Sequence, residues 1–483
     1  MKQDKHLLLT STLTLSMLGA VVAQERPNII IILADDMGYA DAGFTGATDI
    51  LTPNLDKLAA DGVVCTQGYA NHPFSGPSRA ALLSGRYAQR FGFEWNPAND
   101  PHNATQGLSL DETLFSERVQ DAGYTTGAIG KWHIGSAPAY LPNSRGFDYF
   151  YGFSGGGHDY FEIDLYDDDP EGYKQPLMRN NQPAIFEGYI TDAFSDDAVN
   201  FIRKNSDDPF LLYLAYNAPH GPQQAPQEDI ARYSQIENRT RRVYAAQVDV
   251  MDRGIGRVVD ELKAQGLYEN TIIFFMSDNG GPSPYNPNNH WYWNGSSNLP
   301  FRGGKTDLFE GGIHVPFMVC WPGKIDGGVT YDYPVNAIDI SRTAVELAGG
   351  DPSTGKEMEG VNLIPYLSGE INEAPHEALY WRGVNRWAIV DSEGMKLVAN
   401  GDGDDSPMLF DLNKDVAEQS DLATKKRRVV DELQRKWDAW NEDNIEYNML
   451  NYIEYHKMRD EFYKNANPAG YREMVEKNRE TKN

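Results

Sequence analysis

The chain has 483 residues, which is enough for more than one domain and a large core. It carries 43 Lys and Arg residues against 70 Asp and Glu residues, so its formal net charge is −27. This acidic balance argues against nucleic acid as a partner. It leaves room for an anionic small substrate, because salt screening over roughly 10 Å lets a local cluster of Lys and Arg act independently of the rest of the surface.

The N-terminus has the pattern of a secretory signal. Two lysines precede an apolar run over residues 7–22, and small residues stand at the positions before Gln24. We therefore assign residues 1–23 to a signal peptide and expect export to the periplasm or the medium. No cysteine follows the cleavage point to carry a lipid, and no later run of about 20 apolar residues offers a membrane span. The mature protein is expected to be soluble, without a membrane partner.

Short apolar runs alternate with helical patterns through most of the chain. The expected strands are NIIIILA (28–34), TTGAIG (125–130), FLLYLAY (210–216), TIIFFM (271–276) and VPFMVCW (315–321). This alternation predicts an α/β fold, with a mostly parallel sheet flanked by helices.

Three helices carry end signals. The segment 109–123 opens with a capping-box pattern, Ser109 and Glu112, and ends at a glycine. The segment 252–266 also ends at a glycine. In GPSRAALLSG (76–85), a proline suits the first turn, so Ser75 should lie just ahead of a helix start.

The pattern changes from about Ala374. The runs ALYWRG, RWAIVDSEGMKLVA and MLFDLN are typical of antiparallel strands, and a charged helix should begin near Ala423. We therefore divide the mature chain into a catalytic domain, 24–373, and a smaller α+β domain with an antiparallel sheet and terminal helices, 374–483. The only two cysteines, Cys65 and Cys320, lie in apolar stretches and are expected to be buried free thiols, although export permits a disulfide.

Polar side chains follow four of the expected strands directly. An Asp pair after a strand is commonly a turn or a cap, and a single His commonly packs. In open α/β sheets, however, ligands bind beyond the carboxyl ends of the strands, so four such ends at one sheet edge favour a site. The residues concerned are Asp35, Asp36, Lys131, His133, His220, Asp278 and Asn279.

Four of these residues offer only oxygen ligands. Asp35, Asp36 and Asp278 supply carboxylates, and Asn279 supplies an amide oxygen. A hard, all-oxygen set of this kind suits Ca²⁺ or Mg²⁺ and argues against zinc.

The segment SGPSRAALLSGRY offers a candidate nucleophile, Ser75. A helix N-terminus presents unpaired N–H groups and partial positive charge, which favour sulfate or phosphate, and Arg79 lies on the same side of the helix. The alternative is that Ser75 only caps the helix.

This segment resembles the maturation motif of the type I, formylglycine-dependent sulfatases, in which Cys or Ser, any residue, Pro, Ser and Arg follow in that order. The resemblance extends over nearly all of the mature chain. It includes PNIIIILADDMGYAD, TPNLDKLAADG, GAIGKWHIG, RGFDYFYGF, NAPH, SDNGG, FRGGKTDLFEGGIHVP and LFDLNKDVAEQSDLA.

The resemblance implies an alkaline phosphatase-like fold and a mechanism. A serine-competent maturase would oxidise Ser75 to formylglycine, and one hydroxyl of its hydrate would attack sulfur. Arg79 would steady this nucleophile, while Lys131 and Lys305 would bind sulfate oxygens. The set Asp35, Asp36, Asp278 and Asn279 would hold Ca²⁺, with Mg²⁺ the less favoured ion.

The resemblance also implies a division of labour between two histidines. His220 would protonate the departing alcohol oxygen and His133 would act as the base that releases sulfate. One departure is His314, which stands where the family commonly has Arg.

Further substrate contacts are open to two interpretations. The aromatic segment 284–298, with Trp291, is expected either to stack on sugars or to anchor its own loop. His158, in GGGHDYF, is expected either to contact substrate or to pack, and Arg302 is a third candidate contact. These features favour a sulfated carbohydrate, such as an algal or host polysaccharide or its oligosaccharides.

Two alternatives remain. One is a phosphate or phosphonate ester hydrolase of the same superfamily, which the lack of an evident second metal site in the sequence disfavours. The other is a non-catalytic binder of sulfated glycans, which the chemically competent residues at all ten family positions disfavour.

Overall fold

The computed structural model describes residues 26–163, 173–283, 293–383, 385–401 and 406–447, together with Glu454 and Lys457. The proposed signal peptide and Trp291 lie outside the described residues. The division into domains at residue 374 therefore stays a prediction, because part of the second unit also lies outside them.

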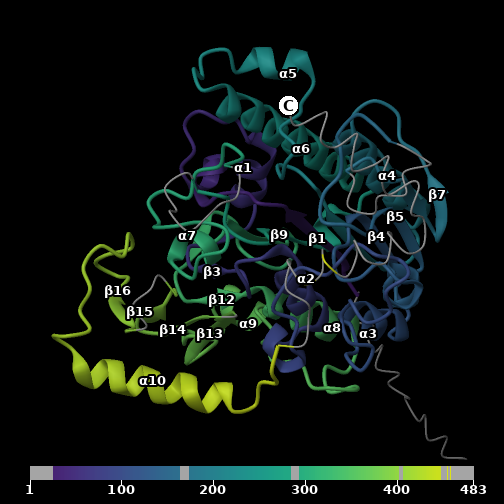
Figure 1. Ribbon diagram of the computed structural model, residues 1–483. Coiled ribbons are helices and arrows are strands. Elements are labelled where there is room, and N and C mark those ends of the chain that lie inside the picture. Colours follow the sequence, from purple (N-terminus) through teal and green to yellow (C-terminus); the bar gives the residue numbers. More distant parts are fainter. Residues whose placement is uncertain are drawn as a thin grey trace, which may run out of the picture.

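A ten-stranded sheet forms the centre of the molecule (Figure 1). In spatial order its strands are β11 (Val329–Tyr331), β2 (Val63–Cys65), β10 (Phe317–Cys320), β9 (Thr271–Ser277), β1 (Asn28–Ala34), β8 (Phe210–Ala215), β4 (Thr125–Lys131), β5 (Tyr149–Phe153), β6 (Leu177–Arg179) and β7 (Gln182–Ala184). The central strands β9, β1, β8, β4 and β5 are parallel, whereas β10 runs antiparallel to both of its neighbours. All five strands expected from the sequence are present, and the α/β fold with a mostly parallel sheet is confirmed.

Helices cover both faces of this sheet. The α-helices described are α1 (Pro53–Ala60), α2 (Ser75–Ser84), α3 (Phe115–Asp121), α4 (Ile190–Lys204), α5 (Gln227–Arg232), α6 (Arg239–Ala264), α7 (Glu310–Ile313), α8 (Ala337–Ala348), α9 (Ile364–Leu367) and α10 (Arg427–Asn441), of which α10 lies on the second sheet. Because side chains alternate along a strand, Ile29 and Ile31 of β1 pack with α2, α3 and α8, while Ile30 and Ile32 pack with α1, α4 and α6. Figure 1 shows these two helical layers on opposite sides of the strands.

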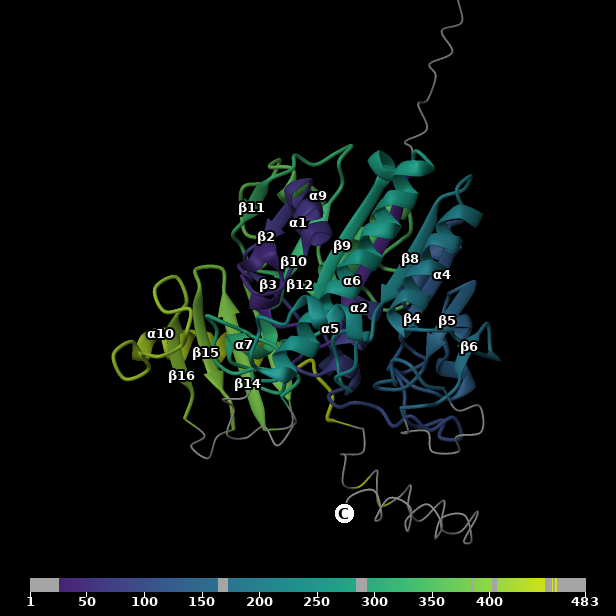
Figure 2. The ribbon, with the colours of Figure 1, turned by 90° about the horizontal axis from the view of Figure 1, so that it is seen from above.

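A second, four-stranded antiparallel sheet lies beside α7 and carries α10 along its outer side (Figures 1 and 2). Its strands follow in chain order, β13 (Ala378–Gly383), β14 (Arg386–Asp391), β15 (Met395–Ala399) and β16 (Met408–Asp411). The antiparallel C-terminal sheet predicted from the sequence is therefore confirmed. A short pair, β3 (Gly68–Tyr69) and β12 (Val335–Asn336), completes the strands described.

Several predicted helix starts differ from the structure. Helix α6 begins at Arg239, well before the predicted segment 252–266, α10 begins at Arg427, and Ser75 is the first residue of α2 and not the residue ahead of it. The helix expected from Ser109 begins at Phe115, as α3, where the Glu117 carboxylate accepts the Leu114 N–H at 2.6 Å. The carboxylate of Glu112 instead pairs with Arg86 at 2.8 Å and Lys356 at 2.9 Å, so tertiary partners use the group that the local pattern assigned to a cap. The predicted free thiols are confirmed, since Cys65 and Cys320 are both buried and unpaired. Within the described ranges, the structure has no helix that combines the length and the apolar character of a membrane span.

Candidate active site

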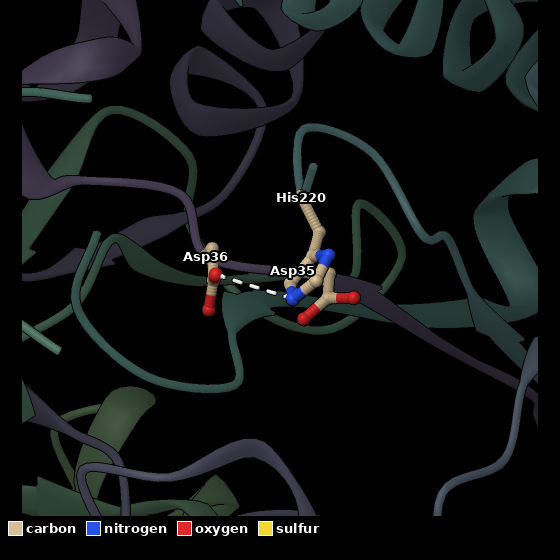
Figure 3. A group of neighbouring side chains, drawn as sticks. All are labelled: Asp35, Asp36 and His220. Carbon is tan, nitrogen blue, oxygen red and sulfur yellow. Dashed lines mark ion pairs between the residues drawn. The ribbon is translucent and has the colours of Figure 1, made fainter. Parts of the chain in front are cut away.

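Four parallel strand ends bring the predicted polar residues together. Leu33 of β1 and Gly130 of β4 both lie opposite Ala215 of β8, and Ala34 lies opposite Ser277 of β9, so the four strands end at one level. The polar residues at these ends are all buried or nearly so: Lys131, the last residue of β4, and Asp35, Asp36, His133, Asp278 and Asn279, which follow strands, are at most 6% exposed. The loop after β8 adds His220, whose Nε2 lies 3.6 Å from Asp36 Oδ2 (Figure 3).

Ser75 faces this edge from the start of α2. It is the first residue of the helix and is buried, and Phe74 holds the N-cap position, with no side-chain cap. The hydroxyl therefore does not cap the helix. Ser75 Oγ lies 3.2 Å from Asp35 Oδ1 and 3.1 Å from Asn279 Oδ1.

Three buried cations compensate the three buried carboxylates. Lys131 Nζ lies 2.7 Å from Asp35, and Lys305 Nζ lies 2.7 Å from Asp36 Oδ1. The Nε and Nη2 atoms of Arg79 both lie 2.9 Å from Asp278 Oδ2. Burying unpaired charge is costly, so each side chain is fixed by the partner that neutralises it.

The same pairings set the protonation states of the carboxylates. Burial alone would raise the pKa of Asp35, but the charges of Lys131, His220 and Arg79 lower it below its ordinary value. Burial opposes the charged form of Asp36 as well, yet Lys305 and His220 lower its pKa. Both carboxyls are therefore ionised, as metal ligands must be.

The oxygens at this edge fit a hard divalent cation. Ligand atoms of Asp35, Asp36 and His220 lie within 4.8 Å of one another. Asn279 Nδ2 donates to Asp36 Oδ1 at 2.7 Å, while its Oδ1 faces Ser75. Asp278 Oδ1 accepts the Asp36 N–H at 3.2 Å, so the fourth predicted ligand contacts the backbone of this group. Carboxylate and amide oxygens are the ligands that Ca²⁺ and Mg²⁺ prefer.

The two candidate acid–base histidines have different surroundings. The carbonyl of Gly221 lies 2.7 Å from His220 Nδ1, so Nδ1 donates there and Nε2 faces the carboxylates. His133 is buried, and its Nδ1 has no hydrogen-bond partner among the described residues. Burial, reinforced by the positive charges of Lys131 and Arg79, holds the pKa of His133 well below its ordinary value, which keeps the ring neutral.

Two predicted substrate contacts have partners within the protein. His158 is buried, and its two ring nitrogens lie 2.6 and 2.7 Å from the carbonyls of Asp159 and Gln175, which favours the packing interpretation. Arg302 lies with its guanidinium 3.8 Å from the centre of the Phe309 ring and donates to the Glu418 carbonyl at 3.1 Å. It therefore contacts the segment that follows the C-terminal sheet.

The sequence analysis missed residues that hold the site segments. Asn96 Oδ1 accepts the N–H of Gly76, next to Ser75, at 2.8 Å. Asn298 bonds the N–H and the carbonyl of Gly281 at 3.0 and 2.7 Å, which fixes the chain after Asn279. Both are single asparagines in irregular segments, and no local pattern distinguishes them from ordinary turn residues.

The chain matches two family models. The sulfatase family model matches residues 27–350, and a model described as N-sulphoglucosamine sulphohydrolase, C-terminal, matches residues 304–443. Human N-acetylgalactosamine-6-sulfatase is 30% identical over 459 residues, which cover 86% of this chain and 85% of that protein. The uncharacterized sulfatase YdeN of Escherichia coli strain K12 is 33% identical over 413 residues, 74% of this chain and 68% of that protein.

Solved structures show the same relationship. The crystal structure of Ps i-CgsB in complex with k-i-k-neocarrahexaose has a TM-score of 0.82 and 38% identity, and the match covers 90% of this chain and 97% of that one. The phosphonate monoester hydrolase of Agrobacterium radiobacter, at 19% identity and a TM-score of 0.60, shares the fold.

Proposed function

From the membership of this chain in the sulfatase family, we propose that this sulfuric ester hydrolase is exported and acts on a sulfated carbohydrate. In this proposal Ser75 is converted to formylglycine. Ca²⁺ is bound by Asp35, Asp36, Asp278 and Asn279. One observation carries the proposal. The Ser75 oxygen lies within 3.2 Å of Asp35 and Asn279, at the edge where the buried cations of Arg79, Lys131 and Lys305 gather. A nucleophile position beside cations is what an anionic sulfate group requires.

Each side chain then has a chemical task. Lys131 and Lys305 bind sulfate oxygens, and Arg79 orients the residue at position 75. A bound Ca²⁺ supplies positive charge that polarises the sulfate and favours the ionised nucleophile. His220 donates a proton from Nε2 to the leaving alcohol oxygen in its doubly protonated form, since Nδ1 keeps its own proton on the Gly221 carbonyl; burial lowers the pKa of His220, and the charges of Asp35 and Asp36 oppose this by favouring the protonated ring. His133, neutral and without a partner on Nδ1, accepts the proton released when sulfate leaves.

A groove of about 1190 Å³ supports a carbohydrate substrate. Three of its lining residues, Ala40, Ser283 and Gly303, belong to the segments that carry Asp36, Asn279 and Lys305. Each of these lining residues is at most four positions from the site residue on the same segment. Because four residues of extended chain span at most about 14 Å, the groove begins close to the site. Its wall includes two aromatic rings, Trp293 and Phe301, together with the small polar residues Thr45, Thr48, Asn238, Ser296 and Ser297. Aromatic and polar side chains together are suited to the faces and hydroxyls of sugars.

Among the described residues, the groove lining offers little positive charge. Its charged members in that part of the chain are Asp49 and Arg241, which form two hydrogen bonds of 2.8 and 2.9 Å with each other. We therefore assign sulfate recognition to the Ser75 site and sugar recognition to the groove.

We expect the activity on sulfated oligosaccharides to be well above the activity on a small aryl sulfate. We also expect Trp293→Ala to impair only the oligosaccharide reaction. Loss of one aromatic contact of about 0.5–1.5 kcal/mol should raise KM for the oligosaccharide about twofold to twelvefold and leave aryl sulfate kinetics unchanged. Sulfate release from both substrates measures this. Tyr333→Ala is a matched control, because Tyr333 is an exposed aromatic residue outside the groove lining. Equal efficiency of the wild-type protein on both substrates would contradict the carbohydrate proposal.

Replacement of His220 tests the acid role. We expect His220→Ala to slow hydrolysis of sugar sulfates by about 10²-fold or more, because a basic leaving oxygen needs a proton. An activated phenol sulfate needs little protonation and should lose less than about tenfold. A leaving-group series measured with converted protein gives the comparison, with the exposed His102→Ala as control. Equal losses on all leaving groups would assign His220 another role.

The phosphoryl alternative is tested by a pair of substrates. Parallel assays with the sulfate and phosphate esters of one phenol should show a preference for sulfate. Preference for the phosphate ester would replace the proposal with the alternative, and binding of a sulfated glycan without turnover by converted protein would favour a non-catalytic binder.

A further inference from the structure

A buried ionic cluster joins the C-terminal sheet to α7. Lys396 of β15 is fully buried, and its Nζ lies 2.8 Å from Glu310 Oε1 and 2.9 Å from Glu418 Oε1. The other oxygen of Glu310 lies 2.8 Å from His314 Nδ1 and accepts a hydrogen bond from the Tyr69 hydroxyl at 2.9 Å. His314, which departs from the family pattern, is therefore part of this cluster, and its other ring nitrogen, Nε2, lies 2.7 Å from the Thr66 carbonyl.

Glu418 also holds the backbone of α7. Its Oε2 accepts the N–H of Glu310, the first residue of α7, at 2.7 Å. Glu418 has a backbone φ of 51°, a left-handed conformation that a non-glycine residue adopts at a cost, so the surrounding contacts hold it there.

The backbone of α7 contacts both halves of the candidate site. The Gly280 N–H, next to Asn279, donates to the Gly312 carbonyl at 3.0 Å, and the Gly311 N–H donates to the Arg302 carbonyl at 2.7 Å. An added Cβ at Gly280 would lie 1.8 Å from the Gly311 oxygen, so the two segments touch with no room for a side chain. The Lys305 N–H in turn donates to the Gly281 carbonyl at 3.0 Å.

The C-terminal sheet holds the Lys305 segment at a second point. Asn400, directly after β15, bonds the Leu308 N–H at 2.8 Å and the Asp307 carboxylate at 3.2 Å through its side chain. Asp307 Oδ2 accepts the N–H of Gly304, next to Lys305, at 3.0 Å. The segment after β15 therefore contacts Asp307 and Leu308 directly. Asp307 in turn holds Gly304, on the other side of Lys305.

We infer that Lys396 and Glu418 are positioning residues, which act through α7 to hold the Asp278–Asn279 turn and the Lys305 segment in register with Ser75. The catalytic part of this inference rests on the proposed function, whereas its structural part does not. Without Lys396, the carboxylates of Glu310 and Glu418 would be buried side by side with no Lys between them, and α7 would lose its anchor on the C-terminal sheet.

The test compares variants at a temperature where all are folded. We expect Lys396→Met and Glu418→Leu to accelerate amide exchange at least about tenfold in the segments 278–283 and 302–312, and not in the central strands. Converted protein should lose at least about tenfold in kcat in the same variants. Glu418→Gln keeps the volume of the side chain and an acceptor for the Glu310 N–H but places its amide nitrogen against the Lys396 ammonium, so it should fold and show smaller losses than Glu418→Leu.

A matched control removes a partly buried ionic contact just ahead of the C-terminal sheet. The ring of His376 lies 2.9 Å from Asp339, a residue of α8, so His376→Gln should lower the melting temperature without changing kcat or local exchange. The inference is overturned if exchange in the two segments does not change, if it rises equally throughout the fold, or if it rises while kcat is unchanged. Absence of sulfatase activity in the converted wild-type protein would instead count against the proposed function, and the exchange comparison would still decide whether the cluster holds the two segments.

Discussion

Protein produced without a serine-competent maturase is expected to fold normally and to hydrolyse sulfate esters at least about 10⁴-fold more slowly than converted protein. Folding should be unaffected because oxidation of Ser75 removes two hydrogens from a side chain whose surroundings, Asp35 and Asn279, already contact its oxygen. Turnover should fail because a plain serine hydroxyl would keep the sulfate as an ester that only water could cleave. Peptide mass spectrometry and sulfate release measure the two quantities.

Two variants serve as controls for this result. Ser75→Cys should gain activity in a host whose maturation system oxidises thiols, and Ser75→Ala should be inactive in every host while keeping the wild-type melting temperature. Activity of Ser75→Ala at the wild-type rate would place the nucleophile elsewhere.

Removal of the metal should have the second largest effect. We expect chelation with EGTA to lower turnover by about 10³-fold and added Ca²⁺ to restore it, because a bound cation contributes several kcal/mol of charge stabilisation in the transition state. Calorimetry with Ca²⁺ gives a second measurement that does not depend on activity.

Two ligand variants sharpen the metal test. Asp278→Ala removes a carboxylate but also leaves Arg79 without its 2.9 Å partner, whereas Asn279→Ala removes an oxygen without unpairing a cation. Both should weaken Ca²⁺ binding. Undiminished turnover by protein shown to be free of metal by elemental analysis would contradict the ligand assignment.

The sheet and the convergence of polar residues could be predicted because both follow from local patterns. Long β-branched runs such as residues 28–34 specify buried strands, and parallel strands must end at the same edge. The residues directly after them, including Asp35 and Lys131, therefore had to lie close together. Helix α3 shows the limit, since Glu112 fits a cap in sequence but pairs with Arg86 in the fold.

The supporting contacts depend on distant parts of the chain and have no local pattern. Lys396 and Glu310 are 86 residues apart, and their 2.8 Å contact arises only when the C-terminal sheet packs beside α7. A single Lys in the apolar run MKLVA was a weak indication that a buried partner existed. The departure at His314 was visible in the sequence, but its partner Glu310 and the direction of its ring required the structure.

The most direct measurement plots sulfate release against the fraction of Ser75 converted to aldehyde. Preparations from hosts with graded maturase levels provide different fractions, each determined by mass spectrometry of the peptide that contains Ser75. The proposed function predicts that the rate of sulfate release from a sulfated oligosaccharide rises in proportion to that fraction and reaches background at zero conversion. A full enzymatic rate in protein that carries only serine would contradict the aldehyde mechanism.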